Sequence, residues 1–339
     1  MALVAGLLSA LAVATPAQAR YATDGSGAYL GAIDWFEWGG PREAIPAGGL
    51  TRTNEREVAG GTLRTTCTIG AVSGGDLIAY RPGNWGGDAL DDLYRIGEPG
   101  NLNQLISGLA NAVDGTTISF PLSCSATLGG APVPLAGLVM ADAEQSGGDE
   151  YVEATIPAGA QWRMIDRLRT DGCISDTTVT RTGQTLRLTG PAAVCPTGPA
   201  GVAFMEDATS AEVTLQGGGV SAIALGVMLF NDFGDAPETY GAAGALYSPG
   251  FTGGPVPQGD SSLFGSTLNT PTQPATRLGA TVDSEGAHQP SAAADADGSD
   301  ENAITPPARI AGRPGTTYTL PRRRVHRPGE RRGLDRLGR

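Results

Sequence analysis

The sequence contains no lysine and only two histidines, and each shortage excludes a class of function. All 23 basic residues of the 339-residue chain are arginine, against 35 acidic residues, so the net charge is −12. So acidic a chain lacks the basic footprint that nucleic-acid binding requires. The histidines are His288 and His326, which excludes Ser-His-Asp triads and histidine-ligated zinc from the first 287 residues.

Aromatic residues are also scarce, at 6% of the chain, whereas glycine (51 residues) and proline (24) are abundant and oppose long helices. Short alternating or β-branched segments recur instead between Gly-, Asp- and Pro-rich turns. This pattern is typical of a β-sandwich or jelly roll. The expected strands cover residues 62–69, 116–120, 150–156, 177–180, 185–188, 211–215 and 221–230.

One segment has helical periodicity. Leu102, Leu105, Ile106, Leu109 and Val113 are spaced i, i+3, i+4, i+7 and i+11, which places them on one face of a helix. We therefore predict a short helix over residues 102–113, packed against a sheet, and a shorter helical turn over residues 88–94. The predicted fold class is all-β with one short helix.

The N-terminus has the features of a secretion signal. An apolar run over residues 3–14 precedes Ala17-Gln18-Ala19, a small-x-small cleavage site. The run is too short to span a bilayer. We expect residues 1–19 to be a signal peptide, the mature chain to begin at Arg20 without a membrane span, and the product to be secreted or held at the cell surface. A buried helix of the mature protein is the alternative.

The four cysteines form no Cys-x-x-Cys motif, which argues against zinc and thioredoxin-like chemistry. In an oxidising compartment an even count predicts disulfides, with three possible pairings. We favour Cys173–Cys195, because their separation of 22 residues fits two neighbouring strands. Cys67–Cys124 then follows by subtraction.

Three aromatic residues, Trp35, Phe36 and Trp38, fall on one expected strand. Because side chains alternate along a strand, Trp35 faces one side and Phe36 and Trp38 the other. We favour a place in the sandwich core over a sugar-stacking platform.

Several separated motifs suggest a family. They are GAYLGAIDWFEWG (27–39), YRPGNWGGD (80–88), GLVMADAE (137–144) and WRMID (162–166). Together they resemble the non-repetitive ligand-binding domain of the CshA-type bacterial surface adhesins. The resemblance implies a lectin-like β-sandwich, which we place at residues 20–231, that binds an extracellular glycan or glycoprotein through surface loops without catalysis.

The following segment resembles a second family. DFGDAPETYG (232–241), LGATVDSE (278–285) and DGSDE (297–301) resemble the GEVED-type β domain of large bacterial surface and secreted proteins. We expect residues 232–320 to be a truncated domain of this type. Residues 321–339, with eight arginines and two acidic residues, do not continue the pattern. We interpret them as an out-of-frame, disordered basic tail; a genuine tail for anionic surfaces is the alternative.

Three residues are weak candidates for ligand binding. Trp85 lies in a Gly-rich segment, where a large aromatic either contacts a ligand or covers the core. Asp142 and Glu144 belong to an acidic loop. Paired carboxylates also serve glycoside hydrolases, so a secreted carbohydrate-active enzyme on a jelly roll is the alternative function, and a structural surface or matrix protein is another.

A calcium site is the one cofactor hypothesis. The carboxylates of the acidic run 294–301 are oxygen ligands of the kind that calcium prefers, although the spacing is not that of an EF-hand. The candidate ligands are Asp295, Asp297, Asp300 and Glu301, with contributions from Asp232, Asp235, Asp283 and Glu285. A disordered acidic loop is the alternative.

Overall fold

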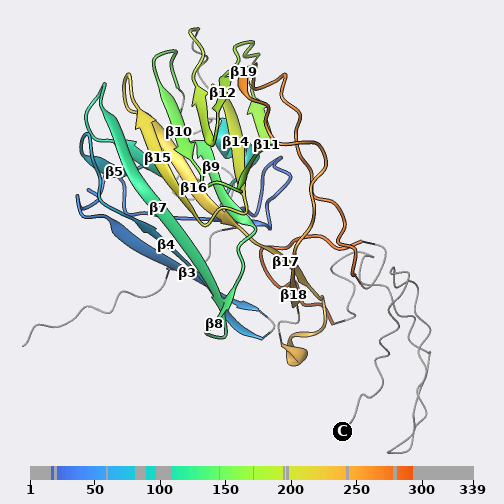
Figure 1. Ribbon diagram of the computed structural model, residues 1–339. Coiled ribbons are helices and arrows are strands. Elements are labelled where there is room, and N and C mark those ends of the chain that lie inside the picture. The colour runs from blue at the N-terminus through green and yellow to red at the C-terminus, as the bar shows by residue number, and fades with distance from the viewer. Residues whose placement is uncertain are drawn as a thin grey trace, which may run out of the picture.

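Figure 1 shows the computed structural model of the chain. It describes residues 17–18, 21–58, 60–80, 89–96, 108–144, 146–170, 172–193, 195, 198–241, 244–277 and 281–292. Most of the expected signal peptide, Trp85, residues 97–107 and the acidic run with Asp295, Asp297, Asp300 and Glu301 lie outside the described residues. In the described part, strands dominate and the one α-helix is short, so the all-β prediction is confirmed.

The larger sheet is mainly antiparallel and has the order β1-β3-β4-β7-β15-β10-β13-β12-β19, with β8 paired to β7. Its strands are β1 (Ala17–Gln18), β3 (Leu50–Val58), β4 (Gly61–Ile69), β7 (Thr117–Leu128), β8 (Ala131–Val133), β10 (Tyr151–Thr155), β12 (Thr178–Thr182), β13 (Thr185–Thr189), β15 (Ser210–Gln216) and β19 (Gly259–Ser262). All of the strands expected in this sheet from sequence are present.

The smaller sheet has the order β11-β14-β9-β16-β6-β5, with β2 paired to β16. Its strands are β2 (Ile33–Trp35), β5 (Leu77–Tyr80), β6 (Gly108–Asn111), β9 (Gly137–Asp142), β11 (Gln161–Arg169), β14 (Pro199–Glu206) and β16 (Ala222–Met228). The two sheets pack face to face (Figure 1), which is the layered arrangement of a β-sandwich.

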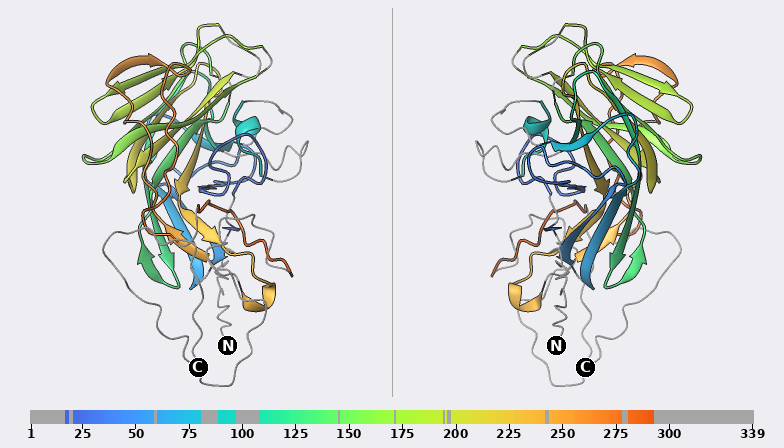
Figure 2. Two further views of the ribbon diagram at one scale, coloured as in Figure 1. Left: turned by 90° about the vertical axis from the view of Figure 1, so that its right-hand side faces the viewer. Right: turned by 90° about the vertical axis from the view of Figure 1, so that its left-hand side faces the viewer.

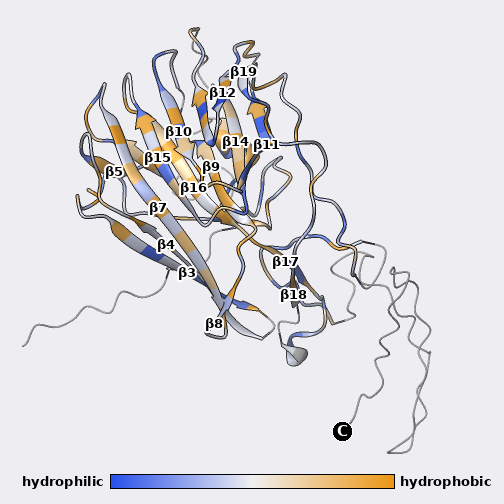
Figure 3. Ribbon diagram, viewed as in Figure 1, coloured by the Kyte–Doolittle hydropathy of each residue, from blue (hydrophilic) through white to orange (hydrophobic). Residues whose placement is uncertain are grey.

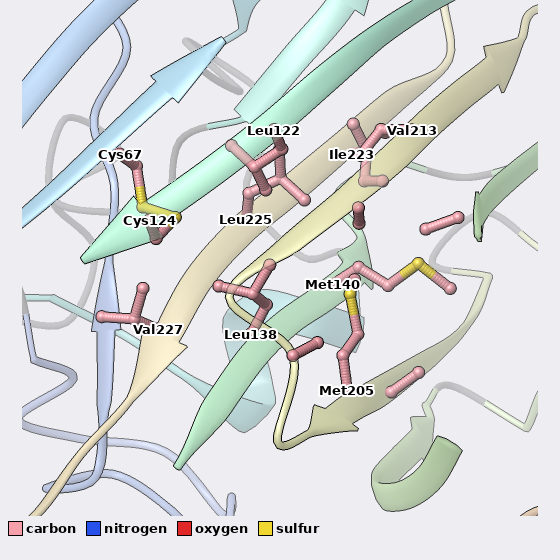
Figure 4. Close-up of a cluster of buried hydrophobic side chains, with 14 of the residues drawn as sticks. Cys67, Leu122, Cys124, Leu138, Met140, Met205, Val213, Ile223, Leu225 and Val227 are labelled. Carbon is pink, nitrogen blue, oxygen red and sulfur yellow. A yellow bond between two sulfur atoms is a disulfide. The ribbon is translucent and has the colours of Figure 1, made fainter. Parts of the chain in front are cut away.

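The main core fills the space between the sheets (Figure 4). From the larger sheet, Leu122 and Val213 point into it, and from the smaller sheet Met140, Ile223 and Leu225 do so. Strand β7 alternates between buried and more exposed positions along most of its length, as expected for a strand with one face on the core. The opposite face of the larger sheet therefore carries its polar side chains.

The smaller sheet is buried on both faces, and its central strands β9 and β16 are mostly hydrophobic (Figure 3). Its outer face is built largely of small residues, among them Ala110, Ala141, Ala222 and Ala224. Small side chains let irregular backbone approach closely. The N-terminal segment 21–32 and helix α1 (Ala89–Leu93) cover this face as a third layer (Figure 2).

The helix expected over residues 102–113 is wrong in its second half, because Gly108–Asn111 is strand β6. Leu109 faces the main core and Ala110 the outer layer, so the strand is buried on both faces. The two central residues of this four-residue strand are both apolar, so no alternation reveals a period of two, and the apolar spacing fits a helix equally well. The α-helix in the described residues is α1, within the shorter turn expected at 88–94.

The aromatic residues near β2 belong to the core, as we favoured. Trp35, Phe36 and Trp38 are each 1% exposed. Trp35 packs in the outer layer, whereas Phe36 and Trp38 pack between the sheets with ring centres 5.7 Å apart. The expected alternation is confirmed, and these side chains are not a sugar-stacking surface.

Both expected disulfides are present. Cys67 and Cys124 face each other across β4 and β7, and their bond lies in the main core. Cys173 and Cys195 instead join the loop after β11 to the loop after β13. The expectation that this second pair lies on neighbouring strands is wrong, because both cysteines lie in turns, closed by the bonds from Cys173 N–H to the Thr170 carbonyl and from Gly198 N–H to the Cys195 carbonyl.

The chain after residue 229 packs against the sandwich. Strands β17 (Phe230–Phe233) and β18 (Gly244–Tyr247) form a two-stranded ribbon, with the short 3-10 helix η2 (Glu238–Tyr240) between them. The segment then runs along β11, where Val256 N–H donates to the Trp162 carbonyl and Asn269 N–H to that of Met164, and it contributes β19 to the larger sheet. No helix in the described residues has the length and hydropathy needed to cross a membrane.

Candidate functional site

The candidate ligand residues Asp142 and Glu144 lie at the end of β9. Asp142 is 5% exposed and pairs with Ile223 of β16, and the Glu144 N–H lies 3.4 Å from its Oδ1. Glu144 is half-buried. One of its two carboxylate oxygens, Oε2, is fully buried. The pair therefore presents little carboxylate surface, and a ligand-binding role for it stays a prediction.

Three carboxylates that we expected to contribute to a calcium site come together. One oxygen from each of Asp232, Asp283 and Glu285 lies within 4.8 Å of the others. The backbone positions them: Glu285 N–H donates to the Asn231 carbonyl (3.0 Å), and its Oε2 accepts from Phe233 N–H (2.8 Å). These bonds place the segment 282–285 (VDSE) beside the segment 232–235 (DFGD). Asp235, the fourth expected contributor, is outside the cluster.

Arg56 of β3 holds this region against the sandwich. Its Nη1 donates to the carbonyls of Glu285 (3.0 Å) and Gly286 (2.9 Å). Its guanidinium lies 4.1 Å from the ring centre of Tyr21 and 5.3 Å from that of Phe233. An arginine between two aromatic faces gains cation–π attraction while it donates hydrogen bonds, so the segment near Glu285 is fastened to the larger sheet.

Beside the carboxylates is a pocket of about 280 Å³. Its walls are the turn 27–32, Phe230 and Tyr247 of the ribbon, and the segments 271–273 and 282–284. Gly31 is required here, because a Cβ at this position would lie 2.1 Å from the Ser284 carbonyl oxygen. Asp283 is exposed and belongs both to the pocket and to the carboxylate cluster.

A second pocket, of about 190 Å³, adjoins the first because both include Phe230 and Tyr247 in their walls. Its other walls are the end of β8 and the turn after it, the residue before β17, and the end of β18 with the residue after it. They consist of Val133, Pro134, Ala136, Leu229, Leu246 and Ser248. The side chains that line this second pocket are mostly apolar, whereas the first pocket has a larger polar share.

Below the first pocket lies a buried polar cluster. The Tyr29 hydroxyl donates to the Asn269 carbonyl (2.6 Å), while the Tyr94 hydroxyl and the Ala28 N–H (3.0 Å) donate to Asp166 Oδ2. Burial raises the pKa of the Asp166 carboxyl, and the two hydrogen bonds oppose that rise. These bonds fix the turn 27–32 on β11, so the cluster shapes the pocket wall from beneath.

Burial also raises the pKa of Tyr21, Tyr29 and Tyr94, with Asp34 adding to the effect on Tyr21 and Asp166 to that on the other two. A raised pKa stabilises the fold below the unfolded value of about 10, and this stabilisation is lost as pH rises above it. Absorbance at 295 nm should therefore show that these three of the eight tyrosines ionise only as the protein unfolds. In urea all eight should ionise near pH 10. Reversible ionisation of every tyrosine near pH 10 in the folded protein would contradict the buried cluster.

Comparison with known proteins identifies the family. Residues 31–228, more than half of the chain, match the model described as surface adhesin CshA non-repetitive domain 2. The chain belongs to this family. The match runs from β2 to the end of β16, so the adhesin domain includes most strands of both sheets. The GEVED-type resemblance of residues 232–320 stays a prediction.

Among solved structures, the chain is similar to the N-terminal domain of the Streptococcus gordonii adhesin Sgo0707. The two share 9% sequence identity with a TM-score of 0.31, over 62% of this chain and 61% of that one. The chain thus spans about three fifths of that structure. No curated protein matches the sequence.

Sequence reasoning missed the two pockets. Asp232, Asp283 and Glu285 could be predicted as site residues because their motifs are acidic. Tyr247 and the turn 27–32 carry no such signal in the sequence. Each pocket forms where segments distant in sequence meet, as with residues 27–32 and 271–284. The glycine pair Gly27 and Gly31 was the available hint, since glycine permits close backbone approach.

Proposed function

We propose that this adhesin domain acts by non-catalytic binding of an extracellular glycan or glycoprotein through its surface loops, either at the bacterial cell surface or after secretion. The observation that carries the proposal is membership of the surface-adhesin family over residues 31–228. The two disulfides support an oxidising compartment outside the cytoplasm. The open pocket beside Tyr247 and Asp283 supplies a recess of about the size that a small polar ligand group fills.

An array of extracellular glycans and glycoproteins tests the proposal. The full chain should bind a subset of the array saturably and release it unchanged. Incubation of the bound members with the chain, followed by mass spectrometry, distinguishes the alternative enzyme. Hydrolysis that is lost in Glu144→Ala would favour a glycoside hydrolase, and absence of any binding would favour a structural role.

Calcium binding is the second part of the proposal. Asp232, Asp283 and Glu285 offer convergent oxygen atoms, and the candidate ligands at 295–301 follow in the chain. Calorimetry with calcium chloride on the full chain should show saturable heat at millimolar calcium or below, in the affinity range of extracellular modules. The heat should be lost in Asp232→Asn/Asp283→Asn and kept in Asp114→Asn, an exposed acid elsewhere. A flat titration of the unaltered chain would end the calcium hypothesis.

A further inference from the structure

The two pockets form one continuous surface with two chemistries. They meet at Phe230 and Tyr247, which pair directly across β17 and β18. The Phe230 ring packs against Tyr247 (ring centres 5.5 Å apart), Tyr29 (6.5 Å) and Phe251 (6.2 Å). This aromatic base is rigid, so the surface is formed before any partner arrives and loses little conformational freedom on binding.

The first pocket suits a positive group. Asp283 lines it and is exposed, and Asp232 and Glu285 place two further carboxylate oxygens within 4.8 Å of the Asp283 carboxylate. A calcium ion on these three carboxylates would compete with a positively charged side chain, so the peptide measurements below are made in calcium-free buffer. No arginine or histidine belongs to the described residues that line this pocket. The Gln273 side-chain amide is held in place by Val282, because one of its two N–H groups donates to the Val282 carbonyl (2.9 Å) and its oxygen accepts from Val282 N–H (2.7 Å). Carboxylate and tyrosine together favour a cation and disfavour an anionic ligand such as an acidic sugar.

The second pocket suits an apolar group. Apart from Ser248, its walls are aliphatic or aromatic, and Leu229 is 3% exposed. An aliphatic side chain would gain from the removal of apolar surface from water there.

We propose that this surface binds an extended protein segment that places an arginine or lysine in the first pocket and an aliphatic side chain in the second. Side chains two residues apart in an extended chain lie on the same side, about 6–7 Å apart, which fits two adjoining pockets. The net charge of −12 would favour the approach of a basic partner. The inference rests on the proposed function and deepens it, because it assigns recognition at this surface to the polypeptide of a glycoprotein.

Fluorescence anisotropy with labelled peptides tests the inference on the full chain. The probes are capped Gly-Xaa-Ser-Zaa-Gly peptides in which Xaa is Arg, Lys, citrulline or Glu and Zaa is Leu, Val or Ser. Peptides with a cation and an aliphatic residue should bind best, and citrulline should weaken binding about tenfold through loss of a charge-assisted contact. Equal binding of the Arg, citrulline and Glu peptides, or binding of none, would overturn the inference.

Charge reversal supplies the sharpest variant. Asp283→Arg should lose the Arg peptide and gain the Glu peptide, and because Asp283 is exposed the fold should be unaffected. Asp114→Arg is the matched control, because Asp114 is also exposed but does not line either pocket. Asp114 lies in the loop after β6, near the start of β16, whereas Phe230, which lines both pockets, follows the end of β16. Glycan binding by both variants without any peptide binding would refute this inference and leave the proposed function intact. Absence of both glycan and peptide binding would contradict both.

Discussion

Replacing Trp162 with alanine is expected to lower the free energy of unfolding by about 3–5 kcal/mol, in the range seen for large aromatic side chains removed from cores. Trp162 is fully buried between the sheets, and its Nε1 donates to the Gln184 carbonyl (2.8 Å). Its removal leaves a cavity and takes one hydrogen bond from the Gln184 carbonyl, which still accepts from Ile156 N–H (3.1 Å). Urea denaturation followed by circular dichroism gives the value.

Val113→Ala is the control for this experiment, because Val113 is 56% exposed and should change stability by less than about 0.5 kcal/mol. If Trp162→Ala cost no more than Val113→Ala, Trp162 would not be at the centre of the sandwich. Such a result would contradict the packing of β11 on the larger sheet.

Replacement of Cys67 and Cys124 by alanine is expected to lower the free energy of unfolding by about 4 kcal/mol, since the bond closes a long loop in the unfolded chain. The cysteines are 57 residues apart. Cys173 and Cys195 are 22 residues apart, and their loss should cost about 3 kcal/mol. The core position of the first pair adds a packing loss that the loop pair does not share.

Thermal and urea unfolding of both double variants measures this difference. Trypsin digestion and mass spectrometry of the unaltered chain should first recover the two expected linked peptides. A larger loss from the Cys173–Cys195 variant, or recovery of a different pairing, would contradict the arrangement of β4, β7 and the loops described here.

The sequence was sufficient to predict several strands that have one face in water, although β3, which is of this kind, was not expected, and β16, buried on both faces, was. Residues such as Ile118, Phe120 and Leu122 alternate with more exposed neighbours, and this alternation marks β7 without tertiary information. The aromatic residues beside β2 were placed correctly for the same reason. Strand β6 could not be recognised, because its two central residues are both apolar and no alternation reveals its period.

The candidate site was predicted only in part. The carboxylates of Asp232, Asp283 and Glu285 were anticipated as contributors, since acidic motifs are visible in sequence. The sequence could not show that Arg56 and Gly31 both contact the segment near Glu285. Arg56 donates to backbone carbonyls of this segment and Gly31 packs against one, and these carbonyls are more than 200 positions away in the chain. Recognition surfaces that form between distant segments depend on the completed fold.

The most direct test of the account is the retention of beads coated with the full chain on immobilised extracellular glycoproteins under flow. The account predicts saturable retention on a subset of these proteins, competition by the free chain, and no change in the mass of the ligand. It also predicts loss of retention when the bead carries chain unfolded by reduction and heat. Equal retention by folded and unfolded chain, or cleavage of the ligand, would contradict a non-catalytic adhesin.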